Sequence, residues 1–287
     1  MAGKPPVVLT IAGFDPSSGA GVTADIKTIA AHGCYGVACI TAMTVQSTAG
    51  VCRVEAVDPT LVTDTLQELA TDIAIAAVHI GMLGTAKVVK AVADFLSQRS
   101  GKAGLPNRLP NVVLDPILKS SSGADLLDAR GRRLLIESLI PVADVITPNV
   151  DEAAILTGVK VTDLDGMRAA AEKLHRMGLA AVVITGGHLD EAIDLLSFTT
   201  KRGVEQEVFK AERQRSNSTH GTGCAFATAM ACHLALERGL AEATLLAKTY
   251  VTAAISAGHP LGRGTGPVHH LYRMHQQRRT ATSGSES

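Results

Sequence analysis

Small and polar residues run directly into an Ala-rich stretch at residues 219–227, which read Thr-His-Gly-Thr-Gly-Cys-Ala-Phe-Ala. We expect a helix to begin here. The first backbone N–H groups of a helix have no partners inside it, and they carry the positive end of its dipole. Because Gly221 and Gly223 permit a close approach, these amides could hold a transferring phosphoryl group. The sequence therefore predicts an anion hole at Gly221, Thr222 and Gly223.

Cys224 lies at the start of the same expected helix. The field of the helix favours the thiolate, and cysteines in such positions have pKa values of roughly 3.5–7.5. A thiolate beside a substrate hydroxyl could accept its proton as a general base. The alternative is that Cys224 is a small packed residue, as most cysteines are. The residues alone leave both interpretations open.

A loop of small residues from 13 to 21 follows the first expected strand and opens a helix. It has neither the Walker phosphate-binding pattern nor the spaced glycines of dinucleotide-binding folds. Small residues let the backbone approach a ligand, and Asp25 comes one turn later, so its carboxylate could face the same pocket. A tight turn with a surface Asp is the alternative. Gln46 follows another expected strand, and its amide would suit a heteroaromatic ring with an amino group, although an exposed loop Gln is the more common explanation of this residue alone.

Polar residues also follow several later strands. Asp115 ends one apolar strand, and Asn149 and Glu152 follow the next. Oxygen ligands from these three residues could hold Mg²⁺, directly or through water, beside nucleotide phosphates. A plain helix N-cap also explains the segment from Asn149 to Glu152. Thr185 and Gly187 follow a further strand and could lie next to a phosphate or a ribose.

The elements that must position these residues alternate along the chain, with short apolar, β-branched runs between longer Ala- and Leu-rich segments. This alternation predicts an α/β fold of three layers, in which a mostly parallel sheet has helices on both faces. Ligands of such sheets lie beyond the carboxyl ends of the strands, which is where the polar loops fall. The expected strands are 7–12, 37–44, 76–80, 112–114, 145–147, 181–185, 192–199 and 204–209, and the expected helices are 21–31, 61–70, 85–98, 169–177, 223–238 and 241–257, with a further short helix capped at Asn149.

Length and composition narrow the class of protein. The chain has 287 residues, 46% of them hydrophobic, and no linker-like shift in composition divides it, so we expect one domain over residues 1–275 and a disordered tail over 276–287. A formal net charge of zero and 3% aromatic residues argue against nucleic-acid or anionic-membrane partners. No apolar run approaches the ~18 residues of a transmembrane helix, and the N-terminus lacks a signal-peptide pattern. Five cysteines without a C-x-x-C pair fit a reduced, cytoplasmic protein.

In their order and spacing, these motifs resemble the hydroxymethylpyrimidine/phosphomethylpyrimidine kinases of the ribokinase-like superfamily. The resemblance covers residues 7–270. The segments that carry it are 10–13, 19–21, 24–28, 35–36, 40–42, 81–83, 114–116, 146–149, 186–188, 219–224 and 266–270, together with Gln46 and Glu152.

The resemblance implies a kinase that uses ATP and Mg²⁺. Its substrates would be 4-amino-5-hydroxymethyl-2-methylpyrimidine and then the monophosphate, giving the diphosphate used in thiamine synthesis. Members of the family are commonly homodimers. Carried over to this sequence, the pyrimidine would contact Gly13, Ala20, Gly21, Asp25, Gln46 and Met82, ATP would contact Asn149, Thr185, Gly187 and Thr219, Mg²⁺ would lie near Asp115 and Glu152, and the catalytic group would be Gly221, Thr222, Gly223 and Cys224.

Two other functions stay open at this level. A pyridoxal-type vitamin B6 kinase of the same superfamily shares the Cys at position 224, although Gln46 favours an aminopyrimidine. A non-catalytic pyrimidine-binding protein on the same fold is the other, and the intact anion-hole motif argues against it. The sequence departs from the family pattern at Phe14, Lys119 and Thr185. Because Thr185 replaces a common Lys near the transferring phosphate, the second phosphorylation is the step left open.

Overall fold

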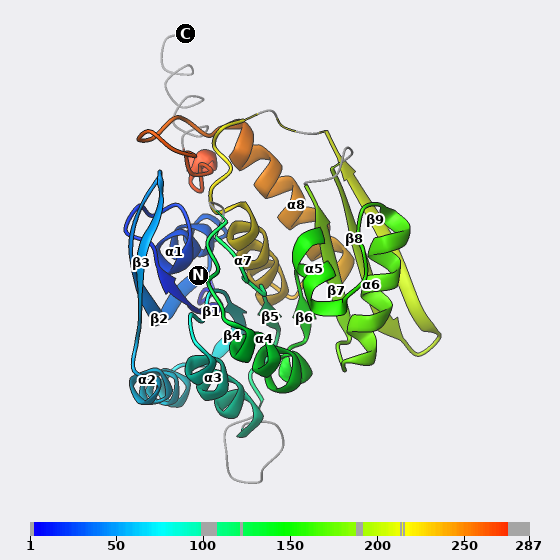
Figure 1. Ribbon diagram of the computed structural model, residues 1–287, viewed down its shortest axis with the longest axis horizontal. Helices are drawn as coiled ribbons and strands as arrows, with labels where there is room; N and C mark the ends of the chain where they lie inside the picture. Colours follow the sequence, from blue (N-terminus) through cyan, green and yellow to red (C-terminus); the bar gives the residue numbers. More distant parts are fainter. Residues whose placement is uncertain are drawn as a thin grey trace.

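A computed structural model describes residues 3–98, 108–120, 123–187, 192–212, 214 and 216–274. The expected tail at 276–287 and His188 of the 186–188 motif lie outside these residues. Within them, nine strands form one sheet in the order β3-β2-β1-β4-β5-β6-β7-β8-β9 (Figure 1). The strands are β1 (Val7–Phe14), β2 (Tyr35–Ser47), β3 (Gly50–Ala56), β4 (Ile75–Ile80), β5 (Val112–Leu114), β6 (Val145–Ile146), β7 (Ala181–Gly186), β8 (Ala192–Thr200) and β9 (Gly203–Ala211).

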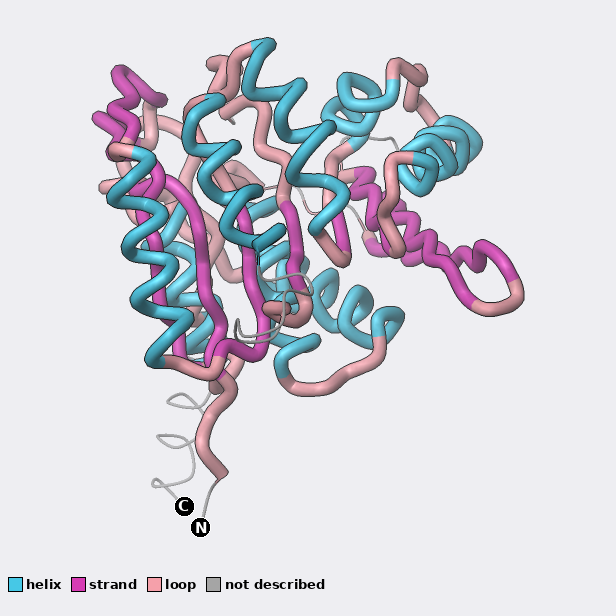
Figure 2. Tube along the Cα trace, turned by 90° about the horizontal axis from the view of Figure 1, so that it is seen from below, coloured by secondary structure: helices cyan, strands magenta, loops and turns pink. Residues whose placement is uncertain are grey.

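The helices lie on both faces of the sheet (Figure 2). They are α1 (Gly21–Ala31), α2 (Pro59–Asp72), α3 (Ala86–Gln98), α4 (Ala129–Leu134), α5 (Val150–Thr157), α6 (Leu164–Arg176), α7 (Thr222–Ala235) and α8 (Leu240–Ser256), with a π-helical turn η1 (Leu135–Leu139) and a 3₁₀ turn η2 (Ile140–Val142) after α4. One apolar core joins the sheet to α1, α7 and α8, and another joins its opposite face to α2 through α6. The predicted three-layer α/β fold is confirmed.

The central strands are apolar because helices cover both of their faces. β1 reads Val-Val-Leu-Thr-Ile-Ala-Gly-Phe, and every residue before Phe14 is buried. It pairs in parallel with β2 on one side and with β4 on the other, and the parallel order continues through β5, β6 and β7. All these strands therefore end at the same edge, so the polar loops that follow them are brought together.

Helix α7 packs over β1, β4 and β5 in the middle of the sheet (Figure 1). Its sequence is rich in alanine, and nearly all of its side chains are buried, including Ala227, Ala229 and Ala231. Small side chains let a helix lie close to the sheet on one side and to neighbouring helices on the other. The N-terminus of α7 is consequently held at the centre of the carboxyl edge.

The structure extends the sheet at its β2 side beyond the prediction. β2 continues to Ser47 and forms an antiparallel hairpin with β3, an element that the sequence analysis missed. Gln46 therefore lies within a strand and does not follow one. β3 carries no continuous apolar run, because most of its side chains are exposed. Its only local signal is the turn at Gly50, whose φ of 142° suits glycine.

Two helical segments also differ from the prediction. α6 begins at Leu164, five residues before the expected start at 169, because the Asp163 side chain accepts a hydrogen bond from Gly166 N–H and caps the helix. The short α4 was not predicted, since it is rich in arginine and has Gly131 as its buried residue. The expected short helix at Asn149 is confirmed as α5.

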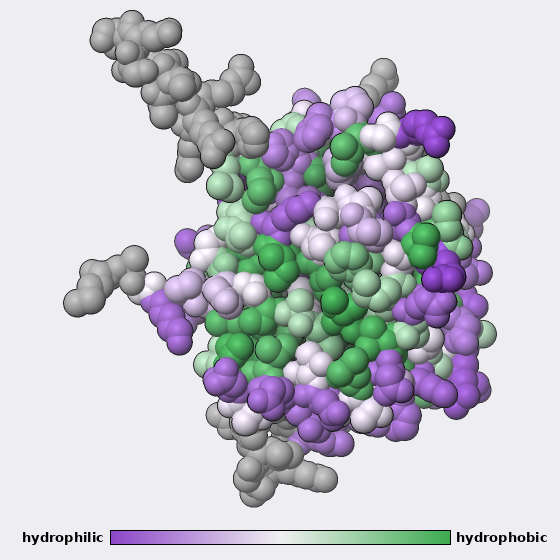
Figure 3. All heavy atoms as spheres, turned by 90° about the vertical axis from the view of Figure 1, so that its left-hand side faces the viewer, coloured by the Kyte–Doolittle hydropathy of each residue, from purple (hydrophilic) through white to green (hydrophobic). Residues whose placement is uncertain are grey.

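Apolar side chains are exposed along β2. Tyr35, Ile40, Met43 and Val45 all have at least a third of their surface exposed. Figure 3 shows apolar surface gathered on the side of the molecule where β2 and β3 lie. No helix in the described part of the chain is long and apolar enough to cross a membrane.

Candidate active site

The residues of the predicted anion hole lie at the N-terminus of α7. Gly221 is the N-cap residue and adopts a left-handed φ of 81°. A Cβ atom at Gly221 would lie 1.8 Å from the carbonyl oxygen of Gly19, so the loop after β1 lies directly against this turn. Thr222 Oγ1 donates to the Thr219 carbonyl at 2.6 Å, and Gly223 is exposed. The first amides of α7 can therefore receive an anion from solvent.

Asp15 organises the loop after β1. Its Oδ1 accepts hydrogen bonds from Ser17 N–H (2.8 Å) and Ser17 Oγ (2.7 Å), and its Oδ2 accepts from Ala20 N–H (3.0 Å) and lies 2.9 Å from His220 Nε2. Burial works to raise the pKa of Asp15, but the bonds from His220 and Ser17 hold it below the usual value. An ionised Asp15 thus ties this loop to the residue before the anion hole.

Asp15 and His220 were not among the predicted site residues. They are separated by 205 positions in the chain, so nothing local connects them. The sequence signal that could have identified them was one polar residue in the small-residue loop after β1 and another immediately before Gly221.

The expected pyrimidine-binding residues, with one exception, gather beside the anion hole. Gln46 Nε2 lies 3.3 Å from His220 Nε2. Gly13 adjoins Met82, because a Cβ atom at Gly13 would lie 2.7 Å from Met82 Cε. Gly21 adopts a φ of 61°, and its Cβ would lie 2.2 Å from the Gly13 carbonyl oxygen. Residues of the β1–α1 segment, of β2 and of the segment after β4 therefore form one wall.

Asp25 is the exception, because it has no exposed surface. Its oxygens accept hydrogen bonds from Thr10 Oγ1 (2.7 Å) and Thr228 Oγ1 (2.9 Å), and His79 Nδ1 lies 3.3 Å from Oδ2. The structure thus differs from the prediction that Asp25 faces the ligand. The inner face of α1 is turned to the sheet, so this carboxylate joins β1, α1 and α7 beneath the site.

Asp115 and Glu152 are buried at the same edge, 4% and 8% exposed. Asp115 Oδ2 is 3.7 Å from the position that a Cβ atom would take at Gly223, so this carboxylate faces the anion hole. Glu152 forms a capping box with Asn149, whose backbone N–H donates to Oε2 at 3.0 Å, while Asn149 Oδ1 accepts from Glu152 N–H at 2.9 Å. The N-cap interpretation of this segment is therefore confirmed.

Both carboxylates have a raised pKa. Burial, followed by the charges of Glu152 and Asp25, raises the pKa of Asp115 well above its usual value. Burial also raises the pKa of Glu152 to about 7. Among the described residues, no group of three or more His, Cys, Asp or Glu side chains is arranged to hold a metal ion by itself. The carboxylates of Asp115 and Glu152 supply oxygen ligands, and a cation beside them would stabilise their ionised forms. They therefore fit Mg²⁺, which is commonly shared between one or two carboxylates and phosphates.

Cys224 is buried, and its pKa is raised, not lowered. Burial is the largest cause, and the charges of Asp115 and Asp25 add to it, while a hydrogen bond from Gly21 N–H has the opposite effect. The expectation of a thiolate is therefore wrong for the protein without ligands. Desolvation and three nearby carboxylates outweigh the favourable field of the helix.

The other residues expected to contact ATP lie along the carboxyl edge of the sheet. Thr185 N–H donates to the Pro148 carbonyl at 2.9 Å, which joins the end of β7 to the α5 cap. Gly187 and Thr219 are exposed. The end of β7 is also held from α8, because Lys248 Nζ lies 2.8 Å from Asp194 Oδ2 and Asp194 Oδ1 accepts from Gly186 N–H at 3.1 Å.

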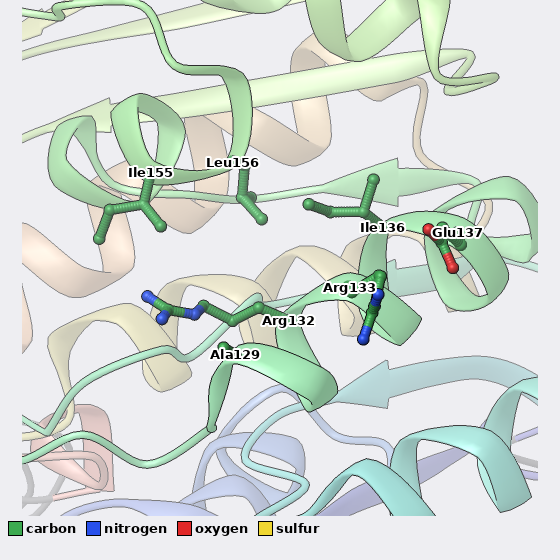
Figure 4. Close-up of a pocket in the computed structure, with 7 residues that line it drawn as sticks. All are labelled: Ala129, Arg132, Arg133, Ile136, Glu137, Ile155 and Leu156. Atoms are coloured by element: carbon green, nitrogen blue, oxygen red, sulfur yellow. The ribbon is translucent and has the colours of Figure 1, made fainter.

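A separate hollow of about 400 Å³ lies between α4 and α5 (Figure 4). None of its lining residues belongs to the group around the anion hole. They are Ala129, Arg132, Arg133, Ile136, Glu137, Ile155 and Leu156. We assign the site to the sheet edge, where the chemistry-bearing side chains converge.

A three-layer α/β fold with an anion hole that faces two buried carboxylates defines the class of ribokinase-like small-molecule kinases. The chain belongs to the phosphomethylpyrimidine kinase family, whose family model matches residues 15–269. It is 41% identical over 271 residues to a hydroxymethylpyrimidine/phosphomethylpyrimidine kinase of Streptomyces coelicolor, covering 94% of this chain and 96% of that protein. It is 42% identical over 266 residues to the thiamine biosynthesis bifunctional protein ThiED of Geobacter sulfurreducens, covering 92% of this chain but 52% of that longer protein.

Solved structures agree with this assignment of the fold. The ADP complex of Bacillus subtilis pyridoxal kinase has a TM-score of 0.82 and 32% identity, with 94% of this chain and 100% of that chain covered. The phosphomethylpyrimidine kinase of Clostridium difficile has a TM-score of 0.75 and 36% identity, with 87% and 99% covered. The expected ribokinase-like fold is thereby confirmed.

Proposed function

We propose that this chain is an ATP-dependent kinase that phosphorylates hydroxymethylpyrimidine and then its monophosphate. The observation that carries the proposal is the open anion hole of α7, which lies between the wall containing Gln46 and the buried carboxylates Asp115 and Glu152. Family membership supports the reaction class. The relative from Streptomyces coelicolor, 96% of whose length is covered by the match, bears the name of this activity.

Each group of residues has a distinct task in phosphoryl transfer. The amides of Gly221, Thr222 and Gly223 stabilise the charge on the transferring phosphoryl group. Asp115 and Glu152 would hold Mg²⁺, which would neutralise phosphate charge when bound. Asn149, Thr185, Gly187 and Thr219 contact ATP, and Gly13, Ala20, Gly21, Gln46 and Met82 contact the pyrimidine, with Asp25 supporting that wall from beneath.

Cys224 is proposed as the general base for the hydroxymethyl group. Two of the carboxylates that raise the pKa of its thiol, Asp115 and Glu152, are the proposed cation ligands. A cation bound there would remove the part of the rise in the pKa of Cys224 that Asp115 and Glu152 cause, while burial, the largest cause, would remain. Cys224 would first release its own proton to solvent, and the resulting thiolate would accept the proton of the substrate hydroxyl as the new O–P bond forms and the bond to ADP breaks.

Product analysis tests the proposal directly. The purified protein is incubated with Mg-ATP and, separately, with hydroxymethylpyrimidine, its monophosphate and pyridoxal, and the products are identified by mass. We expect monophosphate and diphosphate from the pyrimidine. Gly223→Asp should abolish product formation while pyrimidine binding persists. Absence of product from every substrate would favour a binding protein on this fold.

A vitamin B6 kinase is the second candidate function. The TM-score of 0.82 to a pyridoxal kinase is the observation that favours it. Product from pyridoxal alone, in the same experiment, would establish this alternative.

We further propose that residues 1–275 act as one cytoplasmic kinase domain and that two copies associate through β2. The exposed side chains of Ile40, Met43 and Val45 support this interface. Sedimentation equilibrium should give a dimer, and the Met43→Glu, Val45→Glu double variant should sediment as a monomer. A wild-type protein that is monomeric at micromolar concentration would refute the interface.

A further inference from the structure

A buried ion pair joins helix α8 to strand β8. Lys248 Nζ lies 2.8 Å from Asp194 Oδ2, and only 10% of the Lys248 side chain and 7% of the Asp194 side chain are exposed. The same Nζ donates to the carbonyl oxygen of Ala192, the first residue of β8, at 3.2 Å. Charged side chains of these types are rarely buried unless they are paired. Two bonds from one ammonium group therefore fix the start of β8 against α8.

Asp194 connects this lysine to the neighbouring strand β7. It is the partner of Thr185 in the antiparallel register of β7 and β8, and its Oδ1 accepts a hydrogen bond from Gly186 N–H at 3.1 Å. On the other side of β7, Thr185 N–H donates to the Pro148 carbonyl oxygen at 2.9 Å. The end of β7 is thus held from both sides, at the two residues that immediately precede the exposed Gly187.

The charge of Lys248 also matters beside a nucleotide. An ionised Asp194 without a cation would stand opposite Thr185, an expected contact of ATP, and would repel the phosphates in surroundings of low dielectric constant. Burial raises the pKa of Asp194, while the charge of Lys248 and its hydrogen bond act against this rise. Lys248 therefore favours the ionised carboxylate, which can only accept hydrogen bonds, and balances its charge at the same time.

We infer that Lys248 is a positioning residue for the nucleotide: through Asp194 it holds the Gly186 N–H and so fixes the end of β7. The inference rests on the proposed function, because Thr185 and Gly187 are proposed there to contact ATP. Within the described part of the chain, both hydrogen bonds of the ammonium group end on β8, whereas the wall for the pyrimidine is built from other segments. The lysine should therefore affect nucleotide binding and not pyrimidine binding.

Calorimetric titration with Mg-ADP, in the absence of pyrimidine, measures the nucleotide site by itself. Lys248→Met leaves a buried carboxylate without its cation, so we expect the Kd for Mg-ADP to rise by about tenfold or more. The kcat, and the KM for hydroxymethylpyrimidine at saturating ATP, should stay within about threefold of the wild type. Lys173→Met is the matched control, because this lysine on α6 donates to the Thr157 carbonyl oxygen at 3.0 Å. It should change the Kd by about twofold or less.

Two double variants separate the contact with Gly186 from the effect of charge, and they serve equally if Lys248→Met alone does not fold. Both combine Lys248→Met with a neutral residue at position 194, so neither variant buries an unpaired charge. With Asp194→Asn a side-chain oxygen remains for the Gly186 N–H, and the Kd for Mg-ADP should return to within about threefold of the wild type. With Asp194→Leu that oxygen is gone at similar volume, and the Kd should stay about tenfold or more above the wild type.

An unchanged Kd for Mg-ADP in Lys248→Met would overturn the inference, and so would equal Kd values in the two double variants. A KM for the pyrimidine that rises as much as the Kd for Mg-ADP would show that Lys248 is merely structural. A wild type that does not bind Mg-ADP would refute the proposed function itself, and the inference with it, before any variant is compared.

Discussion

At the residue scale, burial controls the charge of the acidic groups at the sheet edge. Glu152 has a pKa of about 7 in the folded chain against 4.5 in water, chiefly because it is buried. Between these two pH values the unfolded chain releases the proton while the folded chain keeps it. The free energy of unfolding therefore falls as pH rises through this window, because the folded state binds more protons.

Glu152→Gln should remove this dependence. We expect the free energy of unfolding of the variant, relative to the wild type, to increase by about 1–3 kcal/mol between pH 4.5 and 7.5. Urea denaturation at both pH values, without Mg²⁺, measures the difference. Glu172→Gln, on the exposed surface of α6, is the control and should give a constant difference. A constant difference for Glu152→Gln as well would contradict the raised pKa.

The raised pKa of Cys224 predicts slow alkylation. Iodoacetamide reacts with thiolates, and Cys224 is both buried and protonated in the ligand-free protein. Cys52 on β3 is exposed and serves as the internal reference. At pH 7.5 we expect Cys224 to be modified at least about tenfold more slowly than Cys52, as measured by peptide mass spectrometry. Comparable rates would contradict the raised pKa and would mean that the field of α7 outweighs burial in setting the pKa of Cys224.

At the element scale, the start of α7 depends on a close approach between two loops. Gly221 lies against the Gly19 carbonyl, and its positive φ is unfavourable for other residues. Gly221→Ala should lower the free energy of unfolding by about 2–4 kcal/mol, because the new Cβ atom forces the loops apart.

Thermal or urea denaturation checks this prediction against Gly239→Ala at the N-cap of α8. A Cβ atom there meets no other atom within 4 Å, and the φ of −63° suits alanine. The control should therefore change stability by about 0.5 kcal/mol or less. Similar losses in both variants would show that the contact with Gly19 is not what requires glycine.

At the scale of the whole molecule, histidines buried in the core limit the stability of the fold in acid. Burial, followed by the charge of His32, lowers the pKa of His233 to about 4, and burial lowers that of His270 to about 4 as well. Within the described residues, neither ring nitrogen of His233 has a hydrogen-bond partner. Each residue stays neutral when folded but binds a proton below pH ~6.5 when unfolded. The stability that these neutral histidines contribute is therefore present above that pH and is lost as pH falls toward 4.

His233→Leu should make the protein less sensitive to acid. Its melting temperature should fall less than that of the wild type between pH 7 and about pH 4.5, because one buried neutral histidine is gone. His259→Gln, at an exposed position, should follow the wild type. An equal decrease in all three proteins would locate the acid sensitivity elsewhere.

The sequence by itself determined the fold class and most of the loops that form the site. Apolar strands and Ala-rich helices alternate with distinct local periods, and neighbouring parallel strands end at one edge of the sheet. The start of α7 could be predicted because glycines and polar residues precede its alanines. β3 and α4 were not predicted, because an exposed strand and a short charged helix lack an apolar period in the sequence.

Only the tertiary structure decided the chemical state of the site. Burial, and then the charges of the carboxylates at positions 25, 115 and 152, raise the pKa of Cys224, and Gln46 lies beside His220, which is distant from it in the chain. Asp25 lies under the site because the packing of α1 turns it inward. Burial and electrostatic interaction are sums over neighbours that distant segments contribute, so no local pattern along the chain contains them.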